Sequence, residues 1–127
     1  RYVGLDLGIG DAGWNYAGLD AIGDLLQLPF GEKTFDACLS VVTLEHVTDP
    51  RRAVAEMARV AKPGARLLLV APLEWEVHQA PHDYFRFTRH GLEHLLGEAG
   101  WKIKRLEAGG GYFRLLARRM MNGLQFF

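Results

Sequence analysis

Three glycines near the start of the chain have the spacing of a loop that cradles a nucleotide. They form the pattern Gly8-x-Gly10-x-x-Gly13 behind an apolar run. In a cofactor site of this kind the glycine loop opens a helix, and the N–H groups of the first turn meet the ligand. The pattern therefore raises the hypothesis of a dinucleotide-dependent oxidoreductase, which depends on a helix following Gly13.

The residues after Gly13 do not favour that helix. The run WNYAGLD over residues 14–20 contains turn-forming residues and shows no apolar stripe. The stretch from Asp6 to Asp24 is also shorter than the roughly 30 residues of a βαβ unit. We therefore interpret Gly8–Gly18 as a loop and the glycine spacing as accidental.

His46 is the first candidate for acid–base chemistry. It lies in the run LEHV (residues 44–47), directly after the apolar segment Phe35–Thr43. Ligands in open α/β sheets bind beyond the carboxyl ends of the strands, and histidine exchanges protons near neutral pH. His46 could act as a general base there, or Glu45 and His46 could simply shape the loop.

A second group of reactive side chains lies in the run HQAPHDYFRFT, residues 78–88. Its aromatic residues suit the walls of a pocket and its polar residues suit the orientation of a ligand. We expect His82 to be a second catalytic candidate, and the substrate-binding residues to be His78, Asp83, Tyr84 and Arg86. The alternative is that these polar side chains hold the loop together by hydrogen bonds.

The same segment could also bind a metal ion through His78, His82 and Asp83. Two histidines four residues apart suit a metal site when they lie on a helix, but Pro81 falls between them. The single Cys38 makes a cysteine-based site impossible. The sequence therefore predicts no metal site.

The remaining pattern alternates strands with helices. We expect strands at Tyr2–Leu7, Leu19–Gly23, Phe35–Thr43, Ala65–Val70 and Trp101–Leu106. One helix should begin at Asp49 and Pro50 and stop at Lys62-Pro63-Gly64, and another should run from Thr88 to Gly100. The continuous apolar run FDACLSVVT predicts a parallel strand covered on both faces, in a single α/β domain over residues 1–127.

The end of the chain, Tyr112–Phe127, is expected to be a helix. Phe113, Leu116, Met120 and Leu124 share one face, next to a basic edge formed by Arg114, Arg118 and Arg119. Packing of the apolar face on the core is the commoner outcome for such a helix, and binding to a membrane surface is the alternative.

Composition limits the classes of partner. The 127 residues include 15 basic and 15 acidic side chains, and 49% are hydrophobic. A balanced charge gives no electrostatic reason for binding nucleic acid. No apolar run reaches the roughly 20 residues of a membrane span, and nothing resembles a signal peptide, so a cytoplasmic protein is expected. The oligomeric state is left open.

Four short motifs, in order, resemble the class I S-adenosylmethionine-dependent methyltransferases. These are D-x-x-x-LPF (residues 24–30), FD (35–36), LEHV (44–47) and KPG followed by A-R-L (62–67), where Ala65 replaces the usual last glycine. The run PHDYFRFT (81–88) is similar to one subgroup of that family. The resemblance covers about Tyr2 to Gly111.

The resemblance implies roles for particular residues. Asp6 would bind both ribose hydroxyls of S-adenosylmethionine, since a carboxylate can accept two O–H bonds in a fixed fork. Asp24 and Leu25 would contact the adenine, and Thr43 would lie at the cofactor beyond its strand. The implied reaction is methyl transfer to an unidentified, small-molecule acceptor.

The resemblance also implies that a part of the family fold is not in this sequence. The expected fold is Rossmann-like, with a mostly parallel sheet and flanking helices, but the first strand and its glycine loop should lie before Arg1. The chain is therefore expected to be an N-terminally truncated fragment. In the family that strand lies centrally, so its loss leaves a gap or forces its neighbours to pair. The alternative is a catalytically inactive methyltransferase-like scaffold.

Overall fold

A computed structural model describes residues 2–10 and 13–123. In chain order its elements are the strands β1 (Leu5–Asp6), β2 (Ala21–Ile22) and β3 (Phe35–Val41), the 3₁₀ helix η1 (Leu44–His46), the helix α1 (Pro50–Val60), the strand β4 (Ala61–Val70), and the helices α2 (Arg89–Glu98) and α3 (Gly111–Gly123). Asp11, Ala12 and Leu124, which belong to patterns considered above, lie outside the described residues.

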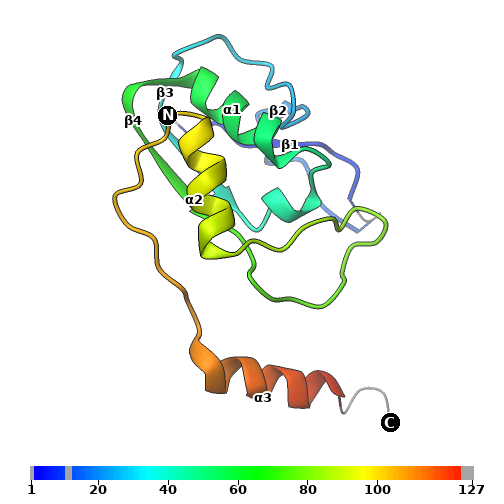
Figure 1. The fold of residues 1–127 in the computed structure, drawn as a ribbon. Helices are drawn as coiled ribbons and strands as arrows, with labels where there is room; N and C mark the ends of the chain where they lie inside the picture. Colours follow the sequence, from blue (N-terminus) through cyan, green and yellow to red (C-terminus); the bar gives the residue numbers. More distant parts are fainter. Residues whose placement is uncertain (1, 11–12, 124–127) are drawn as a thin grey trace.

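All strand pairs of the described chain are parallel, but they form two separate sheets. β1 pairs with β2 through Leu5 and Ala21, and β3 pairs with β4 from Ala37–Arg66 to Val41–Val70. The helices α1 and α2 lie over one face of the β3–β4 sheet, and α3 stands apart from them (Figure 1). The expected α/β class with parallel strands and flanking helices is confirmed.

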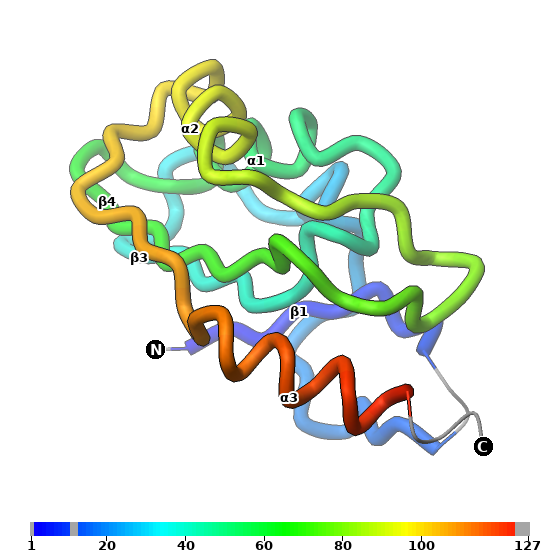
Figure 2. Tube along the Cα trace, turned by 60° about the horizontal axis from the view of Figure 1, so that its bottom comes forward, coloured from blue at the N-terminus to red at the C-terminus, as the bar shows by residue number. Residues whose placement is uncertain are grey.

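The core lies between the β3–β4 sheet and the two helices. Its buried members include Leu44, Val54 and Leu96, and partly buried residues such as Leu67 and Leu69 pack against them. Seen from another side, α1 and α2 form one layer above β3 and β4 (Figure 2). Leu92 and Leu96 of α2 are buried in this core.

Both helix starts are confirmed by their capping bonds. The Asp49 carboxylate accepts a hydrogen bond from the Arg52 N–H at 3.0 Å, with Pro50 in the first turn. The Thr88 hydroxyl accepts one from the Gly91 N–H at 3.0 Å. Such caps satisfy N–H groups that have no partner within the helix. These two bonds fix where the loops that precede α1 and α2 end.

The structure corrects three expectations about strands. Trp101–Leu106 forms no strand; Trp101 and Leu106 instead pack against the core as parts of a loop. The β3–β4 sheet is not covered on both faces, because Leu39 is 60% exposed and Leu68 is 62% exposed. Within the described residues nothing packs over that face. β1 and β2 are also shorter than expected, with two residues each.

The loop and the last helix fall where the sequence placed them. Residues 8–10 and 13–18 contain no helix, which supports the interpretation of the glycine pattern as a loop. α3 forms, but none of its residues is buried, and Phe113 is 83% exposed. The expectation that its apolar face packs on the core is therefore wrong. None of the described helices has the length and apolarity needed to cross a membrane.

Candidate active site

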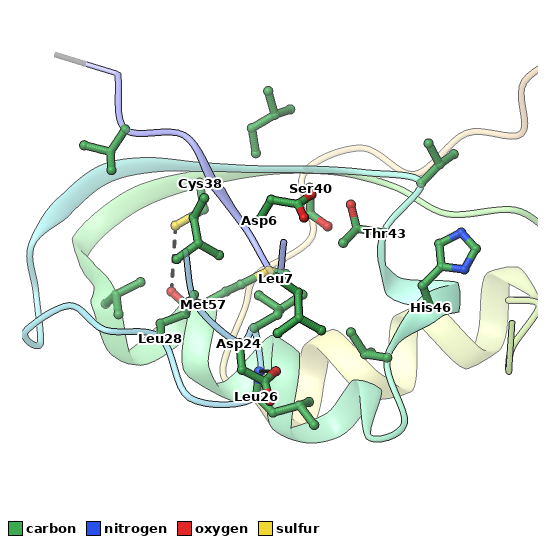
Figure 3. Close-up of a pocket in the computed structure, with 18 of the residues that line it drawn as sticks. Asp6, Leu7, Asp24, Leu26, Leu28, Cys38, Ser40, Thr43, His46 and Met57 are labelled. Carbon is green, nitrogen blue, oxygen red and sulfur yellow. Dashed lines mark hydrogen bonds between the residues drawn. The ribbon is translucent and has the colours of Figure 1, made fainter. Parts of the chain in front are cut away.

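A large open cleft lies between the β1–β2 pair and the β3–β4 sheet, with a volume of about 1610 Å³. In the view of Figure 3, Asp6 and Ser40 are drawn in the upper middle of the cleft lining, Asp24 below them, and Thr43 and His46 to the right. The strands β1, β2 and β3 all deliver their carboxyl ends to this space. The residues that could bind a ligand therefore meet at the edge where open α/β sheets hold their ligands.

Asp6 is held at the end of β1 by its own loop. Its Oδ1 accepts a hydrogen bond from the Gly8 N–H at 2.8 Å, and Gly8 has a positive φ of 74° that favours glycine. No protein group of the described residues donates to its other oxygen in the structure. The Asp6 carboxylate thus faces the cleft with one fixed and one available oxygen.

Asp24 follows β2 and is exposed. Its Oδ1 accepts from the Leu26 N–H at 2.8 Å, a local turn bond that orients the carboxylate. Leu25 is half-buried, lines the cleft and touches the core.

The turn after Asp24 is attached to α1 by charged hydrogen bonds. The Arg59 guanidinium donates to the carbonyls of Leu28 at 3.0 Å and Phe30 at 2.9 Å, and the Glu56 carboxylate accepts from the Leu28 N–H at 2.8 Å. Hydrogen bonds from Arg59 hold the pKa of Glu56 below its usual range. The LPF motif therefore has a structural function: it fixes the loop that carries Asp24 and Leu25.

His46 lies at the end of η1, just beyond β3. Its Nδ1–H donates to the carbonyl of His82 at 2.6 Å, which joins the two loops that follow β3 and β4. The ring of His78 meets the ring of His46 edge-on, with centroids 4.8 Å apart. His46, His82 and Tyr84 all line the cleft together with Thr43.

Asp83 and Arg86 form an ion pair in which the Asp83 side chain is buried and the Arg86 side chain is 24% exposed. Asp83 is 2% exposed, and its two oxygens accept from the Arg86 guanidinium at 2.6 and 2.9 Å and from the His78 N–H at 2.8 Å. These bonds, first those from Arg86, hold the pKa of Asp83 well below its usual range. Asp83 raises the pKa of Arg86 in turn.

The remaining donors of Arg86 bind backbone carbonyls. Its Nε donates to Trp75 at 3.0 Å, Nη2 to Glu76 at 2.8 Å and Nη1 to Phe85 at 2.7 Å. With the two bonds to Asp83, all five N–H groups of the guanidinium are used. The geometry favours the alternative that the sequence left open, in which Arg86 and Asp83 hold the loop. His78, Asp83 and Arg86 are not among the residues that line the cleft.

Comparisons with known proteins identify the family. The methyltransferase domain model matches residues 5–69, which is half of the chain. The chain belongs to the methyltransferase domain family. It is 41% identical over 91 residues to the O-methyltransferase cnsE of Penicillium expansum, a match covering 63% of this chain and 32% of that protein.

Another curated relative and two solved structures agree on the fold. The chain is 42% identical over 50 residues to norajmaline N-methyltransferase of Rauvolfia serpentina, covering 39% of this chain and 17% of that protein. It resembles a S-adenosylmethionine-dependent methyltransferase of Thermotoga maritima, a possible histamine N-methyltransferase (TM-score 0.58, 25% identity, 65% and 45% of the two chains). It also resembles the [4+2]-cyclase SpnF (TM-score 0.58, 27% identity, 68% and 33%).

The fold is that of the Rossmann-like methyltransferases, as the motif series predicted. The matched segments span less than a third of the length of the two curated relatives named here.

Seven of the ten site residues predicted from the sequence line the cleft, but the sequence pattern assigned no role to one charged group beside it other than shaping the loop. Glu45 is 1% exposed, and its Oε1 lies 3.9 Å from the His46 Nε2. Nothing in the sequence indicated that Glu45 would be buried, beyond its place next to His46. The sequence spacing also could not predict that His78, 33 positions further along the chain, lies close to Glu45.

Proposed function

We propose that the cleft binds S-adenosylmethionine and that the protein transfers the cofactor's methyl group to a small-molecule acceptor. The observation that carries the proposal is the meeting of Asp6, Asp24 and Thr43 in one cleft, each at the carboxyl end of a different parallel strand. In this proposal Asp6 accepts from the ribose hydroxyls through its available oxygen. Asp24 accepts from the adenine amine while Leu25 covers the ring.

The protein's contribution to methyl transfer would be positioning and proton removal. The nucleophilic atom of the acceptor attacks the sulfonium methyl in line, and the cofactor supplies the electrophile. If the acceptor is a hydroxyl, His46 and His82 are the candidate bases, since both line the cleft. Tyr84, whose hydroxyl lies 3.2 Å from the His82 Nδ1, and the aromatic side chains near it would form the acceptor wall.

The size of the cleft supports a further part of the proposal. Small-molecule sites are usually about 300–1000 Å³, and this cleft is larger. β1 pairs with β2 and β3 with β4, so both sheets present an edge towards it. We propose that in the active enzyme a further parallel strand and its glycine loop occupy part of this space and hold the methionine end of the cofactor.

The balanced charge of the chain supports a small acceptor rather than a nucleic acid.

The test is calorimetric binding of S-adenosylhomocysteine to the gene product that carries residues 1–127. Asp6→Ala should weaken binding by about 1–3 kcal/mol, the range for hydrogen bonds to a charged group. Asp6→Asn keeps an acceptor for the Gly8 N–H but loses the charge, so its affinity should lie between those of the wild type and Asp6→Ala. A matched control is Glu107→Gln, which changes an exposed acid outside the cleft and should bind as the wild type does.

Equal affinity of the wild type and Asp6→Ala would contradict the ribose assignment. Absence of binding by the wild type would contradict the methyl-transfer proposal as a whole and favour the inactive scaffold.

A further inference from the structure

Beside the cleft, three potential metal ligands come together from the loops that follow β3 and β4. Glu45, His46 and His78 each place one ligand atom within 4.8 Å of the other two. We propose that they form a divalent-cation site whose preferred ion is Zn²⁺. Two imidazoles and one carboxylate are a known ligand set for zinc sites that keep a fourth position open.

Both imidazoles are oriented as metal-binding histidines usually are. The Nδ1–H of His46 donates to the carbonyl of His82 at 2.6 Å, and that of His78 donates to the carbonyl of Glu76 at 3.0 Å. A carbonyl can only accept, so Nδ1 carries the hydrogen in each ring and Nε2 keeps its lone pair. This is the tautomer that binds a metal through Nε2 while a backbone acceptor fixes the ring.

A carboxylate stands behind His78 as well. The Asp83 Oδ2 lies 3.4 Å from the His78 Nδ1 and also accepts from the His78 backbone N–H. Asp83 is itself held by Arg86, so its position does not depend on a metal. A carboxylate behind a ligating histidine raises the basicity of the ligand and commonly accompanies zinc.

The third ligand gives an independent observation. Glu45 is 1% exposed, and among the described residues no group hydrogen-bonds to its buried Oε2. A buried carboxylate oxygen without a donor is costly, and a bound cation would offset that cost. The backbone around Glu45 is fixed, because its carbonyl accepts from the N–H groups of Tyr84 and Phe85 at 2.9 and 3.2 Å.

The site needs a small adjustment to close on an ion. Zinc bonds of about 2.0–2.1 Å in a tetrahedron place ligand atoms about 3.4 Å apart, closer than the 4.8 Å limit observed here. The His78 side chain is 30% exposed and has room to move inwards, whereas the Glu45 side chain is 1% exposed. A bound cation would occupy the Nε2 lone pair of His46. Of the two candidate bases for a hydroxyl acceptor, only His82 would then remain.

The experiment is a thermal melt of the purified full-length protein with and without Zn²⁺, since a ligand that binds the folded state raises Tm. Zn²⁺ should raise the Tm of the wild type but not that of Glu45→Gln or His78→Gln. Without metal, Glu45→Gln should melt at or above the wild-type temperature, because it removes a buried charge whose Oε2 has no hydrogen-bond donor among the described residues. This opposite sign separates a ligand from a residue that merely supports the fold.

Surface histidines supply the matched control. His90 and His94 lie on α2 with acidic neighbours at helical spacing, and His90 is 90% exposed. The double variant His90→Gln/His94→Gln should keep the full Zn²⁺ effect. Loss of the effect in this variant, or an equal effect in His78→Gln, would overturn the proposal in favour of surface binding.

Two further measurements use the coordination itself. Co²⁺ in place of Zn²⁺ should give the visible absorption bands of a four-coordinate site, and these bands should be absent from His78→Gln. Asp83→Asn should weaken Zn²⁺ binding about 10–100-fold in competition with a chromophoric chelator, the usual effect of losing such a partner. Failure of the wild type to bind Zn²⁺ or Co²⁺ would overturn the proposal whatever the outcome for S-adenosylhomocysteine, so the two proposals fail separately.

Discussion

The two faces of the β3–β4 sheet carry similar apolar residues in very different surroundings. On one face Leu67 and Leu69 pack against the core beneath α1 and α2. On the other face Leu39 and Leu68 are about three-fifths exposed and line the cleft. Successive residues of a strand point to opposite faces, so one apolar run supplies both. The comparison separates residues that hold the fold from residues that form the walls of the candidate site.

The largest expected effect comes from a pair of leucine-to-alanine changes. Leu44 is fully buried beside α1, so Leu44→Ala should lower the free energy of unfolding by about 2–5 kcal/mol through lost contacts and a cavity. Leu39→Ala on the open face should change it by no more than about 0.5 kcal/mol. Urea unfolding of both variants measures the difference. Similar losses would mean that the open face is covered in solution.

A smaller effect should appear at low pH. The pKa of Asp83 is held below its usual range in the folded protein, chiefly by Arg86, whereas the unfolded chain should have the ordinary value near 3.8. Its stabilising contribution is therefore complete above that ordinary pKa and is lost as the pH falls below it towards the folded value. Urea midpoints measured from pH 6 downwards should decline in the wild type.

In Asp83→Asn the decline should be shallower, because the titrating group is gone. The same variant should be less stable than the wild type at pH 6, where the carboxylate is charged and paired. Parallel pH curves for the two proteins would contradict the assigned role of Asp83.

The smallest effect concerns α3. No residue of this helix is buried, and it is attached through exposed contacts: Arg119 pairs with Glu74, and the Arg118 guanidinium lies 3.8 Å from the centre of the Trp75 ring. Exposed pairs of this kind contribute little to stability. A chain that stops after residue 110 should therefore keep the unfolding midpoint of the wild type. A clear drop in the midpoint would show that the exposed face of α3 is covered in solution.

The parts of the fold that sequence predicted are those with local signals. Asp49 with Pro50, and Thr88, indicate the helix starts by residue type, and Gly100 follows the end of α2 with a positive φ of 82°. The loop after Gly8 was evident because turn residues follow the glycines. These features depend on neighbours in the chain, which the sequence displays directly.

The errors concern partners that are distant in the chain. The apolar run of β3 looked like a strand covered twice, but the pattern cannot say what lies over each face. Trp101–Leu106 has strand-like residues, yet its two ends are anchored on the core and it pairs with no strand. The motifs predicted that Asp6, Asp24 and His46 lie near one ligand site, because each follows the carboxyl end of a strand. The hydrogen bonds between Arg86 and Asp83 and the approach of His78 to Glu45 could be seen only in the structure.

Hydrogen exchange with and without saturating S-adenosylhomocysteine tests whether the cleft is the cofactor site, because it reports where the cofactor product binds along the chain. We expect slower exchange at the strand ends around the cleft, residues 5–10, 24–28 and 43–46, and unchanged exchange in α2 (Arg89–Glu98) and α3 (Gly111–Gly123). The buried amides of α1 serve as an internal control for global stabilisation. Protection centred on α2 or α3, with the strand ends unchanged, would contradict the assignment of the cleft as the cofactor site.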